Sequence, residues 1–207
     1  MAGSDLDVTG SPKGEQTRRA ILSAAIERFG QDGYRSTSVA KIARDAGVGG
    51  TITYAYFPNK EALFLAALDE DAAGVIEEGT ASVFDDTRPD EWRSELILTL
   101  LEAVERHPLA RRVLCGLEPH VTGRVLEIPA LSELRKACAE RLRSEQAAGT
   151  VRPDIDPVAV GSGMVVIVIS LLTSILQFGQ VGLELYGGDV LSVFAAAIDA
   201  APPPPPD

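Results

Sequence analysis

The stretch TSVAKIARDAGVGGTITYAYFPNKEAL, residues 37–63, decides the fold class of this 207-residue chain. Thr37 or Ser38 can cap a short helix whose apolar residues recur at helical spacing. The glycine-rich run 47–50 then makes a tight turn, and residues 51–57 form one or two further helical turns. Pro58 and Asn59 stop that piece, and Asn59 can cap the next helix. Two short helices joined by a glycine turn are typical of a helix-turn-helix.

A longer helix precedes this pair. It begins near Gln16 and is ended by Gly30 or Gly33, and its apolar face is formed by Ile21, Leu22, Ala25 and Phe29. Three helices at this spacing also fit a small helical bundle without a DNA role, so the spacing alone leaves both interpretations open.

Apolar residues keep helical spacing to the end of the chain. They predict helices over 60–79, 89–107, 131–148, 157–183 and 189–199. Asp156 can cap the fourth of these, with Pro157 at its first position. No convincing strand pattern is present, although 164–169 is rich in β-branched residues, and the fold class predicted is all-α.

Charge divides the chain into two parts. Lys and Arg number 19 and Asp and Glu number 30, giving a net charge of −11. Residues 1–60 carry eight basic and six acidic residues, whereas 61–207 carry 11 and 24. The acidic composition excludes a chain that binds nucleic acid over its whole surface, so only the amino-terminal part can sit on phosphate. The acidic remainder would repel a duplex and leave that part alone to dock.

Cysteine usage and apolar content bear on the compartment. Cys115 and Cys138 make no disulfide framework, and no charged-then-apolar signal peptide opens the chain, so we expect a cytoplasmic protein with free thiols. The uncharged run 157–183 is long enough to span a bilayer, yet it contains Gly, Ser, Thr and Gln and lacks a basic flank near its start. A buried bundle or dimer helix is the favoured interpretation, and a membrane helix is the alternative.

Many positions of the amino-terminal part agree with one known pattern at fixed offsets. They are Ile21-Leu22-x-Ala24-Ala25, Phe29, Gly33-Tyr34, Thr37-Ser38-Val39, Ile42-Ala43, Ala46-Gly47-Val48, Tyr54-x-Tyr56-Phe57 and Lys60-Glu61-x-Leu63. Their order and spacing resemble the amino-terminal domain of TetR-family transcriptional repressors over residues 16–66. Residues 149–157 are similar, more weakly, to the segment that joins the seventh and eighth helices in many members.

The resemblance implies an all-helical homodimer with an amino-terminal helix-turn-helix and a carboxy-terminal helical bundle. Composition predicts a disordered arm over 1–13 and a disordered proline tail over 202–207. On the family pattern, 14–59 is the DNA-binding domain and 60–201 the ligand-binding and dimerisation domain. The resemblance also implies that a small-molecule effector in the bundle moves the fourth helix. This movement spreads the two DNA-binding domains of the dimer, so that the protein releases a palindromic operator. Repression is the expected outcome of DNA binding.

One segment departs from the family pattern. Where members often have Ser-x-Gly-Thr-Leu, this chain has Gly49-Gly50-Thr51-Ile52-Thr53. Gly49 caps more weakly than Ser, Thr53 takes the place of the usual core Leu, and Ile52 stands where a polar DNA-facing Thr is often found. Base preference should therefore differ from that of better-known members.

The expected DNA contacts lie in and around the helix-turn-helix. Hydroxyl and methyl groups of its second helix can meet base edges, while its lack of Arg, Asn and Gln leaves most affinity to phosphate contacts and DNA shape. For Tyr54 and Tyr56, packing within the small domain is the alternative to DNA contact. For Tyr54 the two interpretations have equal weight. The predicted contacts are Ser36, Thr37, Ser38, Lys41, Gly49, Gly50, Thr51, Thr53, Tyr54, Tyr56 and Lys60.

The carboxy-terminal helical bundle is expected to enclose a mostly apolar pocket for a lipophilic or aromatic effector. Ordinary core packing is the alternative for each residue taken singly. Further candidate polar anchors are Arg111, Arg112, Glu118 and His120; no metal or other cofactor is predicted, because Cys115, Glu118 and His120 fit no standard zinc spacing. The predicted pocket residues are Phe64, Trp92, Leu96, Leu100, His107, Cys138, Met164 and Ile167.

A helix apolar on both sides needs two partners, and the second can be another subunit. The predicted dimer contacts are Ile169, Leu172, Thr173, Leu176, Leu191, Phe194 and Ile198.

Two other classes of function compete with this interpretation. The chain has two histidines and no phosphate-binding glycine loop, nucleophile elbow or ligand cluster, so an enzyme is not expected. A helical protein that binds small molecules or protein partners and carries a degenerate DNA head is the alternative to a regulator.

Overall fold

The computed structural model describes residues 11–84 and 91–199, and these parts are helical. Their elements in chain order are α1 (Pro12–Ser36), α2 (Val39–Asp45), α3 (Gly50–Tyr56), α4 (Lys60–Thr80), α5 (Trp92–Arg106), α6 (Pro108–Leu114), the 3₁₀ helix η1 (Thr122–Glu127), α7 (Ala130–Ala148), α8 (Pro157–Phe178) and α9 (Gln180–Ile198). Within the described ranges, the one β pairing is an isolated bridge between Val151 and Asp199. The predicted all-α class is confirmed.

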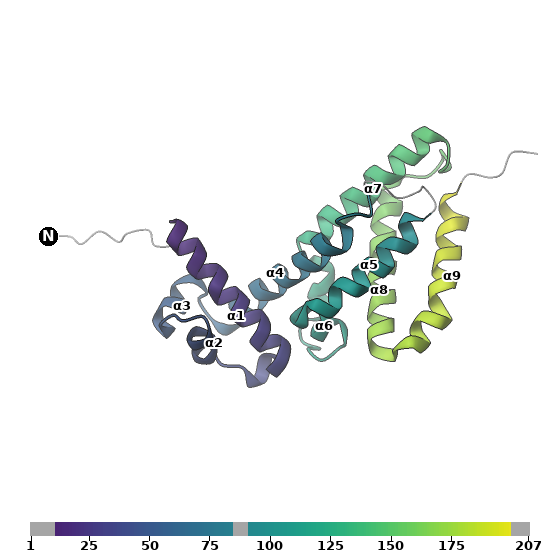
Figure 1. Ribbon diagram of the computed structural model, residues 1–207. Coiled ribbons are helices and arrows are strands. Elements are labelled where there is room, and N and C mark those ends of the chain that lie inside the picture. Colours follow the sequence, from purple (N-terminus) through teal and green to yellow (C-terminus); the bar gives the residue numbers. More distant parts are fainter. Residues whose placement is uncertain (1–10, 85–90, 200–207) are drawn as a thin grey trace, which may run out of the picture.

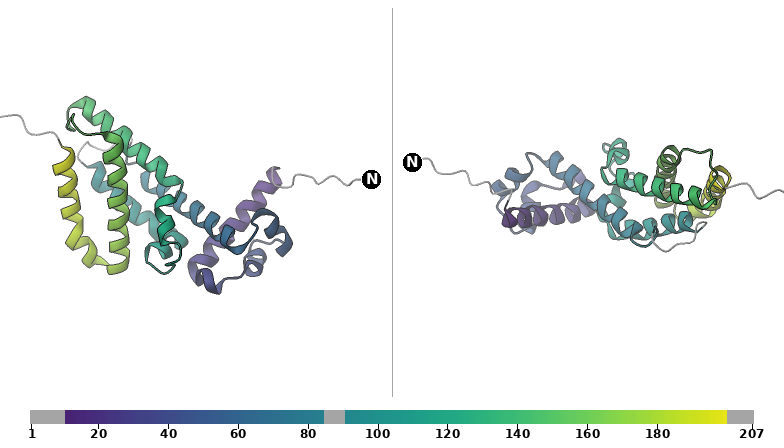
Figure 2. Two further views of the ribbon diagram at one scale, coloured as in Figure 1. Left: turned by 180° about the vertical axis from the view of Figure 1, so that it is seen from behind. Right: turned by 90° about the horizontal axis from the view of Figure 1, so that it is seen from above.

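The molecule has a small head and a larger body. Helices α1–α3 form the head at one end, and α5–α9 form the body at the other (Figure 1). The long helix α4 starts in the head and runs into the body, and the views from behind and above show the same arrangement (Figure 2). A single helix therefore belongs to both parts.

Helix α1 is longer than the sequence pattern indicates. The Ser11 hydroxyl accepts a hydrogen bond from the Gly14 amide and caps a helix that starts at Pro12, not near Gln16. Of the two glycines expected to end it, Gly33 breaks the helical geometry, with φ at +80°, and the chain continues helically to Ser36. Of the expected arm 1–13, residues 12–13 are helical, and 1–10 lie outside the described residues, as does the proline tail.

The predicted apolar faces of the first helices are buried. The expected face of α1, together with Val39, Ile42 and Ala43 of α2, packs in the core of the head. Phe64 of α4 and Trp92 of α5 are fully buried, and Leu131, Leu134, Cys138 and Leu142 of α7 face inward as expected.

The last two helices meet at a different place from the one predicted. Asp156 caps α8 by accepting a hydrogen bond from the Val158 amide at 2.9 Å, as expected. The break then falls at Gly179, where φ is +69°, so the last helix begins at Gln180 and not near Asp189. By length and composition α8 could cross a membrane, but one face of it packs on α7, and such a helix also occurs in the core of soluble proteins.

Candidate DNA-binding head and effector cavity

The helix-turn-helix is fixed by local capping and by its turn. Of the two candidate caps, Ser38 serves α2: its hydroxyl accepts a hydrogen bond from the Lys41 amide at 3.3 Å. Gly47 takes a positive φ of +68° in the turn, a conformation that favours glycine. Gly49 precedes α3 without a side-chain cap, as expected from its lack of a hydroxyl. Arg28 of α1 pairs with Asp45 at the end of α2 and ties these two helices together.

Most of the predicted DNA contacts lie on the surface of the head. The exposed ones are Ser36, Ser38, Lys41, Gly49, Gly50, Thr51 and Tyr54, and the half-buried ones are Tyr56 and Lys60. Tyr54 is 54% exposed, so its side chain does not pack into the domain.

Two of the predicted contacts are buried, and the prediction that their side chains reach DNA is wrong for this arrangement. The Thr37 hydroxyl donates to the carbonyl of Gly33 at 2.8 Å and so closes the kink of α1. Thr53 is 0% exposed because it lies one helical turn before the buried Phe57, on the inward face of α3. Within the described ranges, its hydroxyl oxygen has no hydrogen-bond partner.

Lys60 is held at the junction of head and body. Its ammonium lies 3.4 Å from the carbonyl oxygen of Arg35 and 4.4 Å from the centre of the Tyr34 ring. That ring contacts Phe64 and His120 edge-on or tilted, with centroids 5.2 and 4.9 Å away. Lys60, a predicted phosphate contact, therefore packs against an aromatic cluster whose members come from three segments of the chain.

The prediction omitted exposed residues on the same surface. Arg44 is exposed on α2 three residues after Lys41, a spacing that places both on one helix face. Arg35 is exposed at the end of α1, and Ile52 is 46% exposed on α3. Helical spacing from Lys41 was a signal for Arg44, whereas the exposure of Ile52 follows from the burial of its neighbour Thr53.

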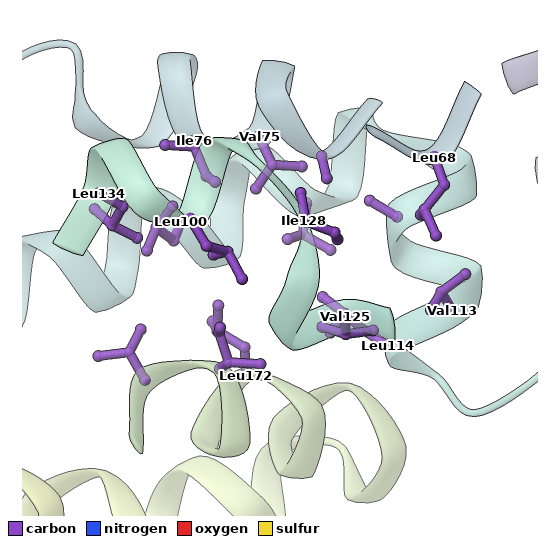
Figure 3. A pocket seen from close by; sticks show the side chains of 16 residues that line it. Leu68, Val75, Ile76, Leu100, Val113, Leu114, Val125, Ile128, Leu134 and Leu172 are labelled. Carbon is purple, nitrogen blue, oxygen red and sulfur yellow. The ribbon is translucent and has the colours of Figure 1, made fainter. Parts of the chain in front are cut away.

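The body has a partly open cavity of about 60 Å³ between α4, α5, α6, η1, α7 and α8. The labelled side chains that point into it are all hydrocarbon (Figure 3). Its lining is Leu68, Ala72, Val75, Ile76, Leu100, Val104, Ala110, Val113, Leu114, Val125, Ile128, Leu131, Leu134, Val168, Ile169 and Leu172.

The predicted pocket residues coincide with this lining only at Leu100. Phe64, Trp92, Leu96, Cys138 and Met164 are buried, but they pack in the core away from the cavity. Ile167 is 38% exposed and faces outward. Ordinary core packing, the alternative interpretation, therefore describes most of the predicted pocket residues. The reason is that more residues of a helical bundle face inward than border one small cavity.

The predicted polar anchor His107 is bound to another helix. Its Nδ1 lies 2.8 Å from the Asp71 carboxylate, which also accepts hydrogen bonds from the Leu109 and Ala110 amides at 2.9 and 2.8 Å. Asp71 of α4 therefore caps the start of α6, and neither side chain lines the cavity.

A second polar joint links the body to the head. The buried Glu118 carboxylate accepts hydrogen bonds from Arg112 Nε at 2.7 Å and from the Tyr34 amide at 3.0 Å. Arg111 instead pairs with Glu105 on the surface, at 3.0 Å. Among the described residues, no group of three His, Cys, Asp or Glu side chains is placed to hold a metal ion.

The predicted dimer contacts lie mainly on inward faces. Leu172, Phe194 and Ile198 are buried within the chain itself, and Leu172 and Ile169 line the cavity. Thr173, Leu176 and Leu191 are half-buried. Among the side chains that the structure describes, the large exposed apolar ones of the last two helices are Val158, Val166, Ile167, Phe178, Tyr186 and Val193. The rotation of α8 differs from the expected one, because a helix without a polar face has no charge pattern to show which side is outward.

Comparison with known proteins supports this architecture. Residues 21–67 match the family described as bacterial regulatory proteins, tetR family. Over 98 residues, the chain is 36% identical to the HTH-type transcriptional regulator RutR of Escherichia coli (strain K12), which covers 47% of this chain and 46% of that protein. It is 39% identical over 57 residues to the fatty acid metabolism regulator protein of Bacillus subtilis (strain 168), covering 28% and 29%. The matched region spans less than half the length of these curated relatives.

Solved structures share the fold over nearly the whole chain. A TetR transcriptional regulator from Chloroflexus aurantiacus superposes with a TM-score of 0.65 at 20% identity, covering 92% of this chain and all of that one. The regulator FadR of Bacillus subtilis, solved with stearoyl-CoA, gives 0.64 at 21% identity, covering 86% and 98%. The head thus matches the tetR family over residues 21–67, and solved TetR regulators share the fold of nearly the whole chain.

Proposed function

We propose that this chain is a ligand-responsive transcriptional repressor that binds a palindromic operator as a homodimer and is released by a small lipophilic effector. One observation carries the proposal: α4 joins the helix-turn-helix head to the apolar cavity. Lys60, the first residue of α4, lies beside the head. The cavity is lined by four residues of the same helix, Leu68, Ala72, Val75 and Ile76.

A change in the cavity would reach the head by two routes. The first is α4 itself, which Asp71 fastens to α6. The second is α6, whose Ala110 and Val113 line the cavity while its Arg112 holds Glu118 against the Tyr34 amide. A ligand can shift the equilibrium between two arrangements of the heads only as far as its affinities for them differ. Side chains on both routes border the cavity, which gives a ligand the means to discriminate.

The lining defines the class of effector. Because every lining side chain is hydrocarbon, an effector would have to bury an apolar portion there and keep any charge outside. The cavity of about 60 Å³ is smaller than the roughly 150 Å³ cavity that accommodates benzene in an engineered protein core. Binding would therefore require lining side chains to move apart. The stearoyl-CoA complex of the Bacillus subtilis regulator shows an acyl compound in a related fold, and long-chain acyl compounds are the first probes for this one.

We propose that the exposed apolar residues of α8 and α9 form the dimer interface. Val166 and Ile167 on α8 and Val193 on α9 lie on the surface of the isolated chain. Two heads related by a two-fold axis would bind half-sites whose centres lie about 34–36 Å or a multiple apart. A cytoplasmic location and the absence of catalysis and of membrane insertion are parts of the same proposal.

Selection of random duplex DNA by the full chain tests this function. Recovery of one inverted repeat, bound by two subunits and released by an acyl compound, is the expected result. Lys60→Ala should weaken binding to all sequences and lower the salt slope by about 1 for each phosphate that the lysine neutralises. Lys136→Ala, which removes the same charge from an exposed position on α7, is the control. Recovery of no sequence would overturn the proposal in favour of a ligand- or protein-binding role.

A further inference from the structure

The outward face of α3 carries no charged side chain and exposes a large hydrocarbon one. Thr53 and the following Phe57 point into the head, which leaves Thr51, Ile52, Tyr54 and Ala55 exposed. Ile52 is 46% exposed although it belongs to a residue type that is usually buried. It sits near the middle of the helix, and even a Cβ added at Gly49 would lie 3.9 Å from its Cδ1 atom.

This face cannot read bases by paired hydrogen bonds. Residues 50–56 contain no Arg, Lys, Asn, Gln, Asp or Glu, and the polar side-chain groups exposed there are the hydroxyls of Thr51 and Tyr54. Bidentate recognition of guanine or adenine needs a guanidinium, an ammonium or an amide. Any base discrimination by α3 therefore has to rest on apolar contact or on single hydroxyl bonds.

The charges around α3 favour duplex DNA as its partner. Exposed Lys41 and Arg44 stand on the adjacent helix α2, and Lys13 lies across a groove that α1 shares with Thr51 and Ile52. Helix α3 lies in the head, away from the body (Figure 1). A hydrocarbon side chain flanked by cations suits a surface that carries phosphates on its rims and a hydrocarbon group on its floor. In the major groove that group is the 5-methyl of thymine.

We propose that Ile52, with the methyl group of Thr51 beside it, determines specificity by contacting thymine methyl groups in each half-site. The inference rests on the proposed DNA-binding function and adds the chemistry of the readout. The operator half-site then contains at least one thymine whose methyl group, not its hydrogen-bonding edge, is recognised.

Deoxyuridine substitution tests this directly. Each thymine of the selected operator is replaced in turn by deoxyuridine, which keeps the base pair and removes only the methyl group. At the contacted position we expect affinity to fall about 3- to 5-fold per half-site, the effect of one buried methyl. Substitutions at positions outside the α3 footprint should leave affinity unchanged.

A double-mutant cycle assigns the contact to Ile52. Ile52→Ala should weaken binding to the thymine operator and abolish the discrimination against deoxyuridine. Because Ile52 is exposed, this variant should keep the melting temperature of the parent protein, which is measured alongside. Lys41→Ala is the matched control: it should weaken binding to both operators by the same factor and preserve the discrimination.

The outcomes separate the inference from the function on which it rests. An operator that tolerates deoxyuridine at every position, or discrimination that persists in Ile52→Ala, overturns the methyl readout and leaves sequence-specific binding intact. Selection that recovers no operator overturns both.

Discussion

Thr53 shows how one residue can destabilise the helix-turn-helix head. Its hydroxyl is buried and has no hydrogen-bond partner in the part of the chain that the structure describes, in the place where the TetR pattern has a leucine. A buried hydroxyl that has lost its water and gained no partner is destabilising. The side chain nevertheless fits the space, since the helix-turn-helix keeps its geometry around it.

Thr53→Val replaces the hydroxyl by a methyl group of similar shape. We expect the free energy of unfolding to rise by about 1 kcal/mol, measured by urea denaturation. Thr51→Val makes the same chemical change at an exposed position and should alter stability by less than about 0.5 kcal/mol. A loss of stability in Thr53→Val would show that the hydroxyl is satisfied in solution.

The two thiols should differ in reactivity. Burial raises the pKa of the Cys138 thiol from 9.0 to about 12, whereas Cys115 is half-exposed. Since the thiolate is the reactive form, iodoacetamide at pH 8 should modify Cys115 in the folded protein and Cys138 only after unfolding, which mass spectrometry can follow. Labelling of native Cys115→Ala at the rate seen in urea would contradict this.

The same shift predicts a pH dependence of stability. Between pH 9 and about 12 the folded protein retains the Cys138 proton that the unfolded chain releases. The free energy of unfolding should therefore fall as pH rises through this window and be unaffected by this group below it. Cys138→Ala, compared with the parent over the same pH range, should remove that part of the slope.

At the scale of elements, the joint between α4 and α6 depends on one carboxylate. Asp71 accepts hydrogen bonds from two amides at the start of α6 and lies beside His107, which precedes that helix. Gly74 lies one turn further along α4, and a Cβ there would come within 2.4 Å of the His107 ring. The two helices are thus held close by both a polar anchor and the absence of a side chain.

Asp71→Ala should lower the free energy of unfolding by about 3 kcal/mol, because it leaves two buried amides and a histidine without their acceptor. Chemical denaturation measures this effect. Glu70→Ala removes a carboxylate from the adjacent exposed position and is the control. Equal effects of the two substitutions would mean that the joint contributes nothing to stability.

At the scale of the whole molecule, the proposed dimer depends on a surface that a single chain leaves uncovered. Ile167→Glu places a charge on the outward face of α8, where it should abolish dimerisation while the isolated chain stays folded. Sedimentation equilibrium should report half the parent mass, and operator affinity should fall with it. Leu98→Glu, at an exposed position on α5, is the control and should leave the dimer intact. A dimer of unchanged stability in Ile167→Glu would exclude this surface.

Charge also acts at this scale. The part of the chain after residue 60 holds 24 acidic residues, and the amino-terminal part is slightly basic. Proposed contacts with phosphate are therefore confined to the head, where Lys41, Arg44 and Lys60 lie at or near the surface.

Local sequence patterns predict those structural features that depend on residues close together in the chain. Helical periodicity, the caps at Asn59 and Asp156 and the glycine turn follow from interactions over a few positions, and they predict the all-α class and the register of the helix-turn-helix. The buried faces of α1 and α7 were also predictable, since charged residues mark their opposite sides.

Only the tertiary structure decided which apolar residues border the cavity and which face outward. Helix α8 carries no charge, so its rotation is set by the helices packed against it, which are α7, α9, α6 and α5. Ile167 and Leu172 exchange their predicted places. Thr37 and Thr53 turned inward for the same reason: a hydroxyl fits either a core or a surface, and the surrounding helices decide. Contacts between distant segments determine these positions, and local sequence patterns contain no information about them.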